Sequence, residues 1–257
     1  MSCICYNLSK SKSKLIGYNQ AWKWQKSLMD LLHSEGDQSP HRLIILEHPS
    51  IYTLGRGGSL DHLINKNENT DIIRVERGGE ITWHGPGQLV MYPILNLKQQ
   101  PLRKDLHWLV NNLEQVVIDT LDLSYNIKSQ RSEVNNGVWI DNKKISAVGI
   151  TASRWITMHG ISLNMNPDMK SYDSIVPCGI TDNNYGVTSI DEVLKERGEH
   201  IDWNHQENND IVIDSFVKSF ERNFNLNLYE SPHPDIELDV IYDVISKDKD
   251  YKEPKHL

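Results

Sequence analysis

The sequence RGGEITWHGPGQ at residues 77–88, with four glycines and one proline in twelve positions, is the feature that most constrains the fold. So many helix-breaking residues are incompatible with a helix and are typical of a turn cluster between strands. Apolar runs at 71–76 and 89–97 flank it and predict two short buried strands. Pro93 lies inside the second run, which predicts that this strand is at a sheet edge or carries a bulge.

The rest of the chain mixes helical and strand periods. Apolar residues recur every three to four positions over 18–35 and 105–121, and two further helices are predicted near 190–197 and 211–224. Ser189, followed by a glutamate three residues later, predicts the start of the third helix. The other predicted strands lie at 42–48, 137–141, 144–150 and 155–165, and Asn142 and Lys143 would form the hairpin turn between the second and third of these.

Because strands outnumber helices and several neighbours are joined by short turns, the sequence predicts an α/β or α+β fold with a mixed sheet flanked by helices. There is no internal repeat and no composition typical of a linker. We therefore expect one catalytic domain over residues 1–230. A charged C-terminal tail over 231–257 is expected to be only loosely attached.

Composition excludes several classes of function. A formal net charge of −8 argues against nonspecific nucleic-acid binding. No apolar run is long enough for a membrane span, and the N-terminus lacks the apolar core of a secretory signal. Three cysteines are too few for a disulfide framework, so a reducing, cytoplasmic setting is the expectation. We also expect a monomer. Cys3 and Cys5 fit either a metal site or an initial strand.

Glycine-rich loops often bind phosphate, but this one has the wrong spacing. Gly78, Gly79, Gly85 and Gly87 match neither of the two common phosphate-binding motifs. A nucleotide site is therefore not indicated. A serine hydrolase is not indicated either, because the chain has no GxSxG sequence.

Cys178 is the strongest candidate nucleophile. Pro177 restricts the backbone on one side, and Gly179 leaves the sulfur approachable on the other. A thiol with an ordinary pKa of about 8.5 needs a nearby cation to ionise at neutral pH. A buried structural cysteine remains an alternative, as does a zinc site formed with two histidines, although no closely spaced ligand pair supports zinc. The candidate cations are Lys143, Lys144, Arg77, His84 and His159. His84 and His159 are also the two histidines of the zinc alternative.

Five sequence blocks, in a constant order between about residues 15 and 224, resemble the octanoyltransferase family of lipoate biosynthesis. The blocks are EHPSIYTLGRGG (47–58), RGGEITWHGPGQLVMYPILNL (77–97), GVWIDNKKISAVGI (137–150), MHGISLNMN (158–166) and IVPCGI (175–180). The resemblance implies a fold similar to the biotin and lipoate protein ligases. It also implies transfer of an octanoyl group from octanoyl-acyl carrier protein to a lysine of a lipoyl domain. The implied acceptors are the E2 subunits of 2-oxoacid dehydrogenases and the glycine cleavage H protein.

The resemblance also implies roles for individual residues. Cys178 would carry the acyl group as a thioester, and Lys144, not Lys143, would be its partner. No metal, nucleotide or other cofactor is implied, because the thioester arrives already activated. The departures from the family pattern, Trp83, Ser146 and Ser162, are expected to reshape the acyl groove slightly. The implied substrate-binding residues are Arg77, Gly78, Gly79, Glu80, Ile81, Thr82, Trp83, His84, Ala147, Val148, Gly149, His159, Gly160, Ile161 and Ser162.

Two rival hypotheses remain at this point. One is an ATP-dependent lipoate or biotin ligase of the same fold, which would depend on an adenylate-binding lysine and would not need Cys178. The other is a catalytically silent protein that only binds acyl carriers or lipoyl domains. The presence of both Cys178 and Lys144 favours the transferase.

Overall fold

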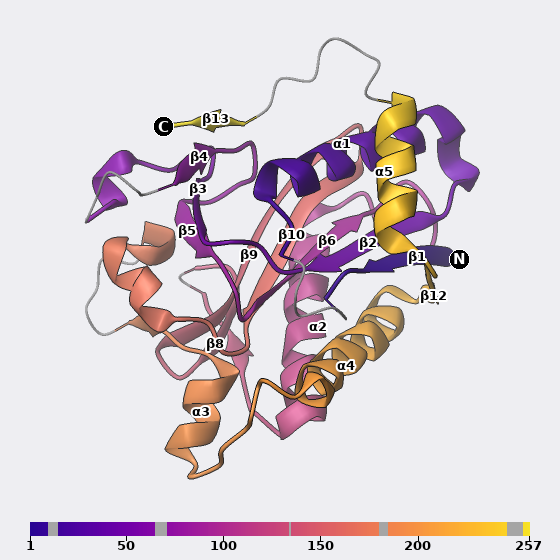
Figure 1. The fold of residues 1–257 in the computed structure, drawn as a ribbon. Helices are drawn as coiled ribbons and strands as arrows, with labels where there is room; N and C mark the ends of the chain where they lie inside the picture. The colour runs from indigo at the N-terminus through magenta and orange to yellow at the C-terminus, as the bar shows by residue number, and fades with distance from the viewer. Residues whose placement is uncertain (10–14, 65–70, 134, 180–184, 246–253) are drawn as a thin grey trace.

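A computed structural model describes residues 1–9, 15–64, 71–133, 135–179, 185–245 and 254–257. A large mixed sheet runs through the middle of the molecule, and a smaller sheet lies beside it (Figure 1). In spatial order the large sheet consists of β12 (Asn227–Glu230), β1 (Ser2–Asn7), β2 (His41–Leu46), β6 (Gln88–Ile94), β10 (Ile156–Asn164), β9 (Lys143–Ser153), β8 (Val138–Ile140) and β7 (Gln130–Arg131), with β11 (Gly186–Val187) also paired to β9. Strand β1 is parallel to both of its neighbours, β12 and β2. From β2 across the sheet to β7, each strand is antiparallel to the next one in the spatial order. The predicted mixed sheet is therefore confirmed.

The order of the small sheet is β13 (Lys255–His256), β4 (Ile72–Arg74), β3 (Ile51–Leu54) and β5 (Ile81–His84). It contains three strands that the sequence did not predict, β3, β5 and β13. Strands β3 and β5 have only four residues each and are followed closely by glycine, so their alternation is too short to be recognised. Part of the glycine-rich sequence is therefore a strand, antiparallel to β3.

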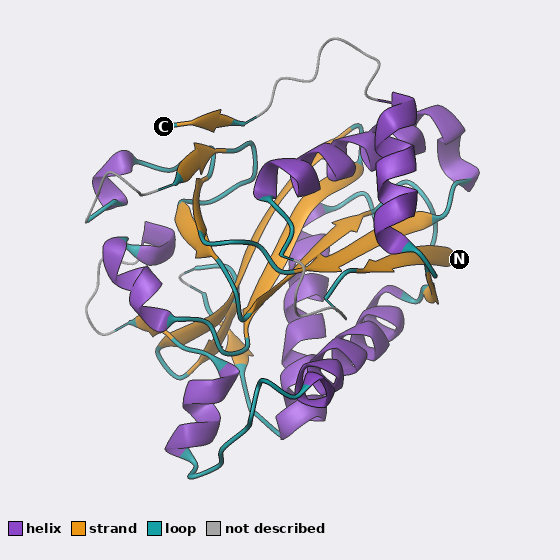
Figure 2. Cartoon of the chain, viewed as in Figure 1, coloured by secondary structure: helices purple, strands orange, loops and turns teal. Residues whose placement is uncertain are grey.

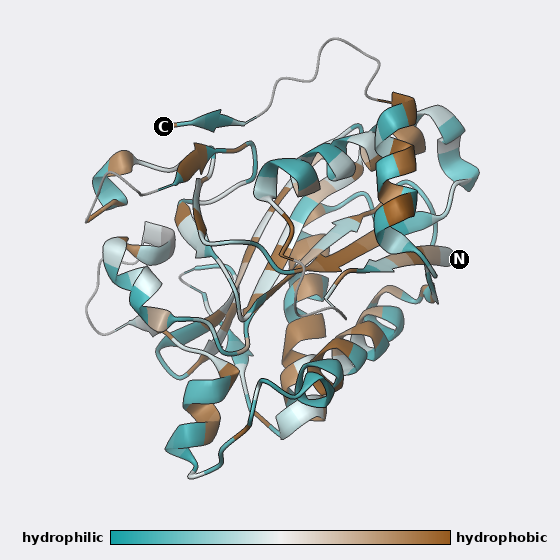
Figure 3. Ribbon diagram, in the orientation of Figure 1, coloured by the Kyte–Doolittle hydropathy of each residue, from teal (hydrophilic) through white to brown (hydrophobic). Residues whose placement is uncertain are grey.

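Helices cover both faces of the large sheet (Figure 2). Helices α1 (Tyr18–Glu35) and α5 (Pro234–Ile245) pack on one face, and α2 (Leu106–Tyr125) and α4 (Gln206–Phe224) on the other, while α3 (Ile190–Glu196) lies at one end. Leu43 and Ile45 of β2 belong to the α2–α4 core, whereas Ile44 and Leu46 belong to the α1–α5 core. This alternation follows from the period of two in a strand, and apolar segments line the interior in Figure 3. The short 3₁₀ helices are η1 (Gly36–Gln38), η2 (Leu60–His62), η3 (Met169–Ser174) and η4 (Pro177–Gly179).

The predicted helices are all present, with differences at their ends. Helix α2 begins after Asp105, whose side chain accepts hydrogen bonds from the backbone N–H groups of His107 (2.9 Å) and Trp108 (3.1 Å). It continues four residues beyond the predicted end. Ser189 caps α3 as predicted and accepts from the N–H of Glu192. Helix α4 starts five residues before the predicted start because its first turn is polar.

The prediction that Pro93 marks a sheet edge or a bulge is wrong: no register shift occurs at Pro93 in the pairing with β2. Strand β6 is interior, and Pro93 pairs with Leu43 of β2. On the other side, the register with β10 stops at Met91, two residues before the proline. Thr157 restores the polar contacts there: its hydroxyl donates to the Pro93 carbonyl (2.6 Å) and accepts from the N–H of Leu95 (2.9 Å). The missing N–H of proline is thus accommodated inside the sheet.

Two other predictions need correction. The β8–β9 hairpin turn is formed by Asp141, with φ of 50°, and Asn142, one residue before the predicted turn. The chain after Pro232 is not loosely attached over residues 234–245: these form α5, and its Leu238 is fully buried in the α1–α5 core. Frequent charges hide the helical period of α5 in the sequence.

The N-terminal cysteines behave as strand residues, as one of the two interpretations held. Cys3 and Cys5 are both buried in β1. Among the described residues, no helix is both long enough and apolar enough to cross a membrane. The division of the chain at residues 230 and 231 remains a prediction.

Candidate active site

A cavity of about 400 Å³ lies where residues 77–84 meet the middle of the large sheet. Its walls come from the glycine-rich segment and from the consecutive strands β9 and β10, which follow that segment much later in the sequence. The structure thus brings together most of the residues that the resemblance had implied: Arg77, Gly78, Gly79, Glu80, Thr82, His84, Lys144, Ala147, Val148, Gly149, His159, Gly160, Ile161 and Ser162.

Two of the implied substrate-binding residues do not reach the cavity. Successive residues of β5 face opposite sides, so Thr82 and His84 line the cavity while Ile81 and Trp83 point away from it. Both are buried in a small core between β5 and the 3₁₀ helix η3, and the Trp83 indole donates to the Ser50 hydroxyl (3.0 Å). They support the wall from behind.

Several cavity residues were missed by sequence reasoning. Tyr18 comes from the start of α1, Val110 from α2, and Tyr92 from the far end of β6. Their sequence patterns do not show which cavity they face. The remaining residues of this group are Val90, Asn135, Asn136 and Ile150.

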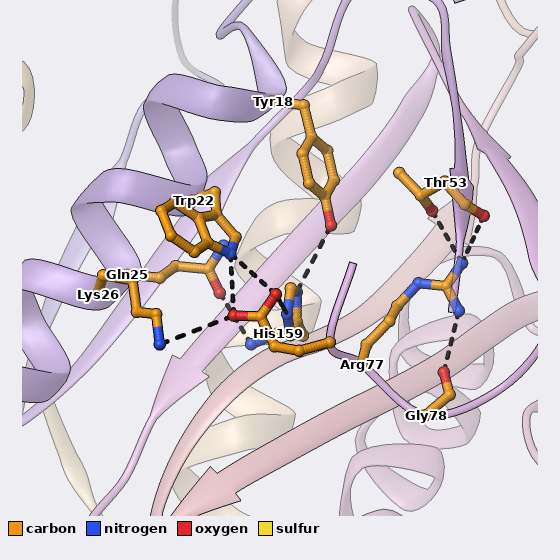
Figure 4. A network of polar contacts seen from close by, with 9 residues as sticks. Tyr18, Trp22, Gln25, Lys26, Thr53, Arg77, Gly78 and His159 are labelled. Atoms are coloured by element: carbon orange, nitrogen blue, oxygen red, sulfur yellow. Dashed lines mark hydrogen bonds and ion pairs between the residues drawn. The ribbon is translucent and has the colours of Figure 1, made fainter. Parts of the chain in front are cut away.

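Arg77 holds the glycine-rich segment in place. Its Nη2 donates to the backbone carbonyl and to the hydroxyl of Thr53, both at 2.8 Å, and Nη1 donates to the carbonyl of Gly78 at 2.9 Å (Figure 4). The N–H of Gly78 donates to the carbonyl of Ile150 on β9 (3.1 Å). A β-carbon added at Gly149 would lie 3.0 Å from the Gly78 oxygen, so this close approach of two backbones favours glycine. The cavity wall here is bare backbone, tightly held.

His159 forms part of a buried polar network (Figure 4). Its backbone N–H donates to Gln25 Oε1 (2.8 Å), and its Nδ1 lies 3.5 Å from the Tyr18 hydroxyl. Its Nε2 lies 3.7 Å from a carboxylate oxygen of Glu76, which also accepts from the Trp22 indole (3.0 Å). Burial lowers the pKa of His159, and the nearby carboxylate offsets only part of that effect. A neutral imidazole results at neutral pH.

Two further buried histidines are neutral for the same reason. His84 Nδ1 donates to Gln88 Oε1 (2.7 Å), and burial, with His48 nearby, lowers its pKa to about 3. His48 Nδ1 donates to the carbonyl of Ile16 (2.6 Å), its Nε2 accepts from the Tyr92 hydroxyl (2.8 Å), and burial lowers its pKa to about 4. His84 and His159 therefore do not supply the cation that a reactive thiol needs. Lysine is left as the better candidate.

These histidines make stability depend on pH. In the unfolded chain a histidine titrates near 6.5, so below that pH the unfolded state binds protons that the buried imidazoles exclude. Stability is therefore complete above pH 6.5 and is lost as the pH falls towards 4. We expect His48 alone to account for about 3 kcal/mol of this loss. Urea unfolding at pH 7 and pH 4.5 measures it; a His48→Gln variant should lose less stability over the interval, and an equal loss would contradict the assignment.

The structure separates the two adjacent lysines of β9. Lys144 points into the cavity and is almost fully buried; its Nζ donates to Asn135 Oδ1 (2.7 Å) and lies 5.1 Å from the centre of the Trp139 ring. Lys143 faces the other side of the strand, where its half-exposed side chain forms an ion pair with Glu196 (2.9 Å). Only Lys144 is placed for chemistry in the cavity.

The side chain of Cys178 lies outside the described residues, but the turn that carries it is described. Its backbone belongs to η4, next to Gly179, whose φ is +71°. A β-carbon added at Gly179 would lie 3.1 Å from Cγ of Glu80, so η4 packs against the glycine-rich segment. Pro177 and Lys144 line one small cavity together with Thr82. The Cys178 turn is therefore adjacent to Lys144, and the role of Cys178 itself stays a prediction.

The described residues contain no group of three or more His, Cys, Asp or Glu side chains arranged to hold a metal ion. His84 uses its Nδ1 hydrogen for Gln88, and its Nε2 faces the Thr53 hydroxyl at 3.4 Å. The zinc alternative requires Cys178 as a third ligand, and its side chain is not among those described.

The sequence that builds this site matches a known family. Residues 17–223 match the family model for the lipoyl protein ligase A/B catalytic domain. The chain belongs to that family. A chloroplastic octanoyltransferase of Arabidopsis thaliana is 43 % identical over 234 residues, covering 88 % of this chain and 80 % of that protein. An octanoyltransferase of Nostoc punctiforme is 47 % identical over 188 residues, covering 72 % of this chain and 77 % of that protein.

Solved structures of lipoate protein ligases share the fold. A lipoate-protein ligase A bound with ATP superposes with a TM-score of 0.67 at 11 % identity, over 94 % of each chain. A bi-partite lipoate protein ligase from Thermoplasma acidophilum gives a TM-score of 0.60 at 11 % identity, over 96 % of this chain and 94 % of that one. The implied fold is thus confirmed for the lipoate ligases, while the sequence relatives distinguish this chain as closer to the octanoyltransferases.

Proposed function

We propose that this protein is an octanoyltransferase of protein lipoylation, which moves an octanoyl group from octanoyl-acyl carrier protein to a lysine of a lipoyl domain. The observation that carries the proposal is the position of Lys144, buried in a cavity walled by the glycine-rich segment and adjacent to the turn of Cys178. The proposed acceptors are the lipoyl domains of 2-oxoacid dehydrogenase E2 subunits and the glycine cleavage H protein. The cytoplasmic location and the monomeric state remain predictions of the sequence.

The first half of the reaction forms an acyl-enzyme. The Cys178 thiolate attacks the carbonyl carbon of the carrier thioester, a new C–S bond forms, and the bond to the carrier sulfur breaks. The leaving thiolate takes up a proton, which Lys144 can donate from its ammonium group. The ammonium also favours the thiolate form of Cys178 by Coulombic attraction. Backbone N–H groups of the glycine-rich wall are available to stabilise the tetrahedral oxyanion.

The second half regenerates the enzyme. The uncharged amine of the acceptor lysine attacks the Cys178 thioester, an amide forms, and the Cys178 thiolate leaves. The attacking nitrogen gives up one proton, which the neutral form of Lys144 can accept. Protons and charges balance over the two halves, and no nucleotide is consumed, because the thioester supplies the activation.

The shared fold leaves an ATP-dependent ligase as the main alternative. A likeness of 11 % identity to such ligases supports the fold alone. The relatives at 43 and 47 % identity are octanoyltransferases, and they favour the transferase reading. A protein that merely binds its partners would not need a lysine buried beside the Cys178 turn.

ATP dependence distinguishes these alternatives. We expect the protein to transfer octanoyl from octanoyl-acyl carrier protein to a purified lipoyl domain in a buffer without ATP or Mg²⁺, detected as an octanoyl mass increase of the domain. Free octanoate, with or without ATP, should not be a donor. Transfer from free octanoate only when ATP is present would establish a ligase instead, and no transfer from either donor would support a binding protein.

A further inference from the structure

A buried carboxylate beneath the cavity has no place in the mechanism above. Glu114 of α2 is only 3 % exposed, although it lies on a helix whose other carboxylates are more accessible. Its Oε1 accepts a 2.7 Å hydrogen bond from the backbone N–H of Gly137, and its Oε2 lies 3.3 Å from Nε of Arg131. A carboxylate is costly to bury unless it is paired, so both contacts are needed to keep it there.

Gly137 connects this carboxylate to Lys144. Its φ is +128°, a conformation that other residues rarely adopt. A β-carbon added there would lie 2.3 Å from the carbonyl oxygen of Ser146 and 3.2 Å from Cε of Lys144. The backbone of Gly137 is therefore packed directly against the Lys144 side chain, and Glu114 holds that backbone through its N–H.

The residues on either side of Gly137 complete the enclosure of Lys144. Asn135 supplies the oxygen that accepts from Nζ of Lys144 at 2.7 Å. Trp139 donates from its indole to the carbonyl of Asn135 (3.1 Å) and places its ring face 5.1 Å from the same Nζ. Residues 135–139 thus set the position of the ammonium group on two sides, and Gly137 is the point at which they are attached to α2.

Charge favours the same arrangement. Burial raises the pKa of Glu114, while the Gly137 N–H, Arg131 and Lys144 act against that effect. The Lys144 ammonium and the Arg131 guanidinium both interact with this carboxylate. An ionised Glu114 would attract Lys144 towards α2 at low local dielectric, in addition to its hold on the backbone.

We propose that Glu114 is a positioning residue for Lys144: through Gly137 it fixes residues 135–139 around the lysine and so fixes where the ammonium group meets the reacting thioester. The inference rests on the proposed function, because it assigns Glu114 an effect only through Lys144. A displacement of about 1 Å in a group of this kind can reduce a rate by about 10²-fold. Glu114→Ala should therefore lower the acylation rate constant by about 30- to 100-fold and leave the KM for octanoyl-acyl carrier protein within about twofold.

Glu114→Gln is the conservative variant. Its amide oxygen can still accept from the Gly137 N–H, while its charge is lost, so the acylation rate should fall by about three- to tenfold, and a wild-type rate would count against the inference. Asp122→Asn is the matched control: it removes one negative charge from the same helix at a half-exposed position paired with Lys128. That variant should keep the wild-type rate. Circular dichroism and thermal unfolding of each variant show whether it is folded, and Glu114→Gln carries the test if Glu114→Ala is not.

A double-mutant cycle tests whether Glu114 acts through Lys144. The readout is the alkylation rate of Cys178 by iodoacetamide at pH 7, located by peptide mass analysis, which needs neither carrier nor acceptor. We expect both Glu114→Ala and Lys144→Ala to slow alkylation and the double variant to be no slower than Lys144→Ala alone. Independent, multiplying effects, or a wild-type rate in both Glu114 variants, would overturn the inference while leaving the proposed function intact. A wild-type rate in Lys144→Ala would remove Lys144 from its proposed role and overturn the inference, while octanoyl transfer itself is tested separately by the ATP-free assay.

Discussion

A Cys178→Ala variant should form no octanoyl adduct and should transfer octanoyl to a lipoyl domain at least about 10³-fold more slowly than wild type. Alanine has no nucleophile, so the two thiol-based steps collapse to direct attack of the acceptor amine on the carrier thioester. The remaining cavity still binds both substrates and still presents backbone donors, so a small residual rate is expected. Intact-mass measurement after incubation with octanoyl-acyl carrier protein detects the adduct, and the same preparation gives the transfer rate.

The other cysteines provide an internal control for this experiment. Cys3 and Cys5 are buried in β1, on a different part of the large sheet from the cavity strands β9 and β10. A Cys5→Ala variant should keep a hydroxylamine-sensitive octanoyl adduct of normal yield. An adduct that persists in Cys178→Ala and disappears in Cys5→Ala would place the nucleophile elsewhere. Full transfer by Cys178→Ala would show that no thioester forms on this residue.

The sequence predicted elements well where a period repeats several times. Helices α1 and α2 are each about five turns long, so the spacing of their apolar residues repeats often enough to identify each segment as a helix. Strands β3 and β5 have four residues each, which is too few to show alternation, and each is followed directly by glycine. The Pro93 prediction failed because the side chain that makes the polar contacts around it, donating to the Pro93 carbonyl and accepting from the Leu95 N–H, belongs to Thr157, which is 64 residues away from Pro93 in the sequence. Compensation of that kind leaves no local signal.

In the site, too, the sequence predicts which segments take part but not which way each side chain faces. The resemblance indicated the whole segment 77–84, and the structure then divides it: the period of β5 turns Ile81 and Trp83 into the core behind the wall. Tyr18 and Glu114 were not predicted, because a tyrosine at a helix start and a glutamate within a helix look like ordinary surface residues. Only the packing of α1 and α2 on the large sheet gives them buried positions near the cavity.

A Lys144→Ala variant should lower the octanoyl transfer rate by about 10²- to 10⁴-fold, the range found for loss of a positioned proton donor and acceptor. Two consequences of the substitution combine. The Cys178 thiol loses the cation that favours its ionised form, and the leaving carrier thiolate loses its proton donor. The first consequence appears in the alkylation rate of Cys178 at neutral pH, and raising the pH should partly restore that rate. The second remains at high pH and appears only in acyl transfer.

Lys143→Ala is the matched control for that result, since it removes the same charge one residue away. Lys143 projects from the opposite side of β9 and pairs with Glu196 in solvent, so its loss should change neither alkylation nor transfer by more than about twofold. Equal losses in both variants would mean that net positive charge near the cavity, not position, accounts for the effect. Lys144→Arg separates the two properties further: it keeps the cation but cannot accept a proton at accessible pH. It should therefore retain thiol reactivity while remaining slow in transfer to the acceptor lysine.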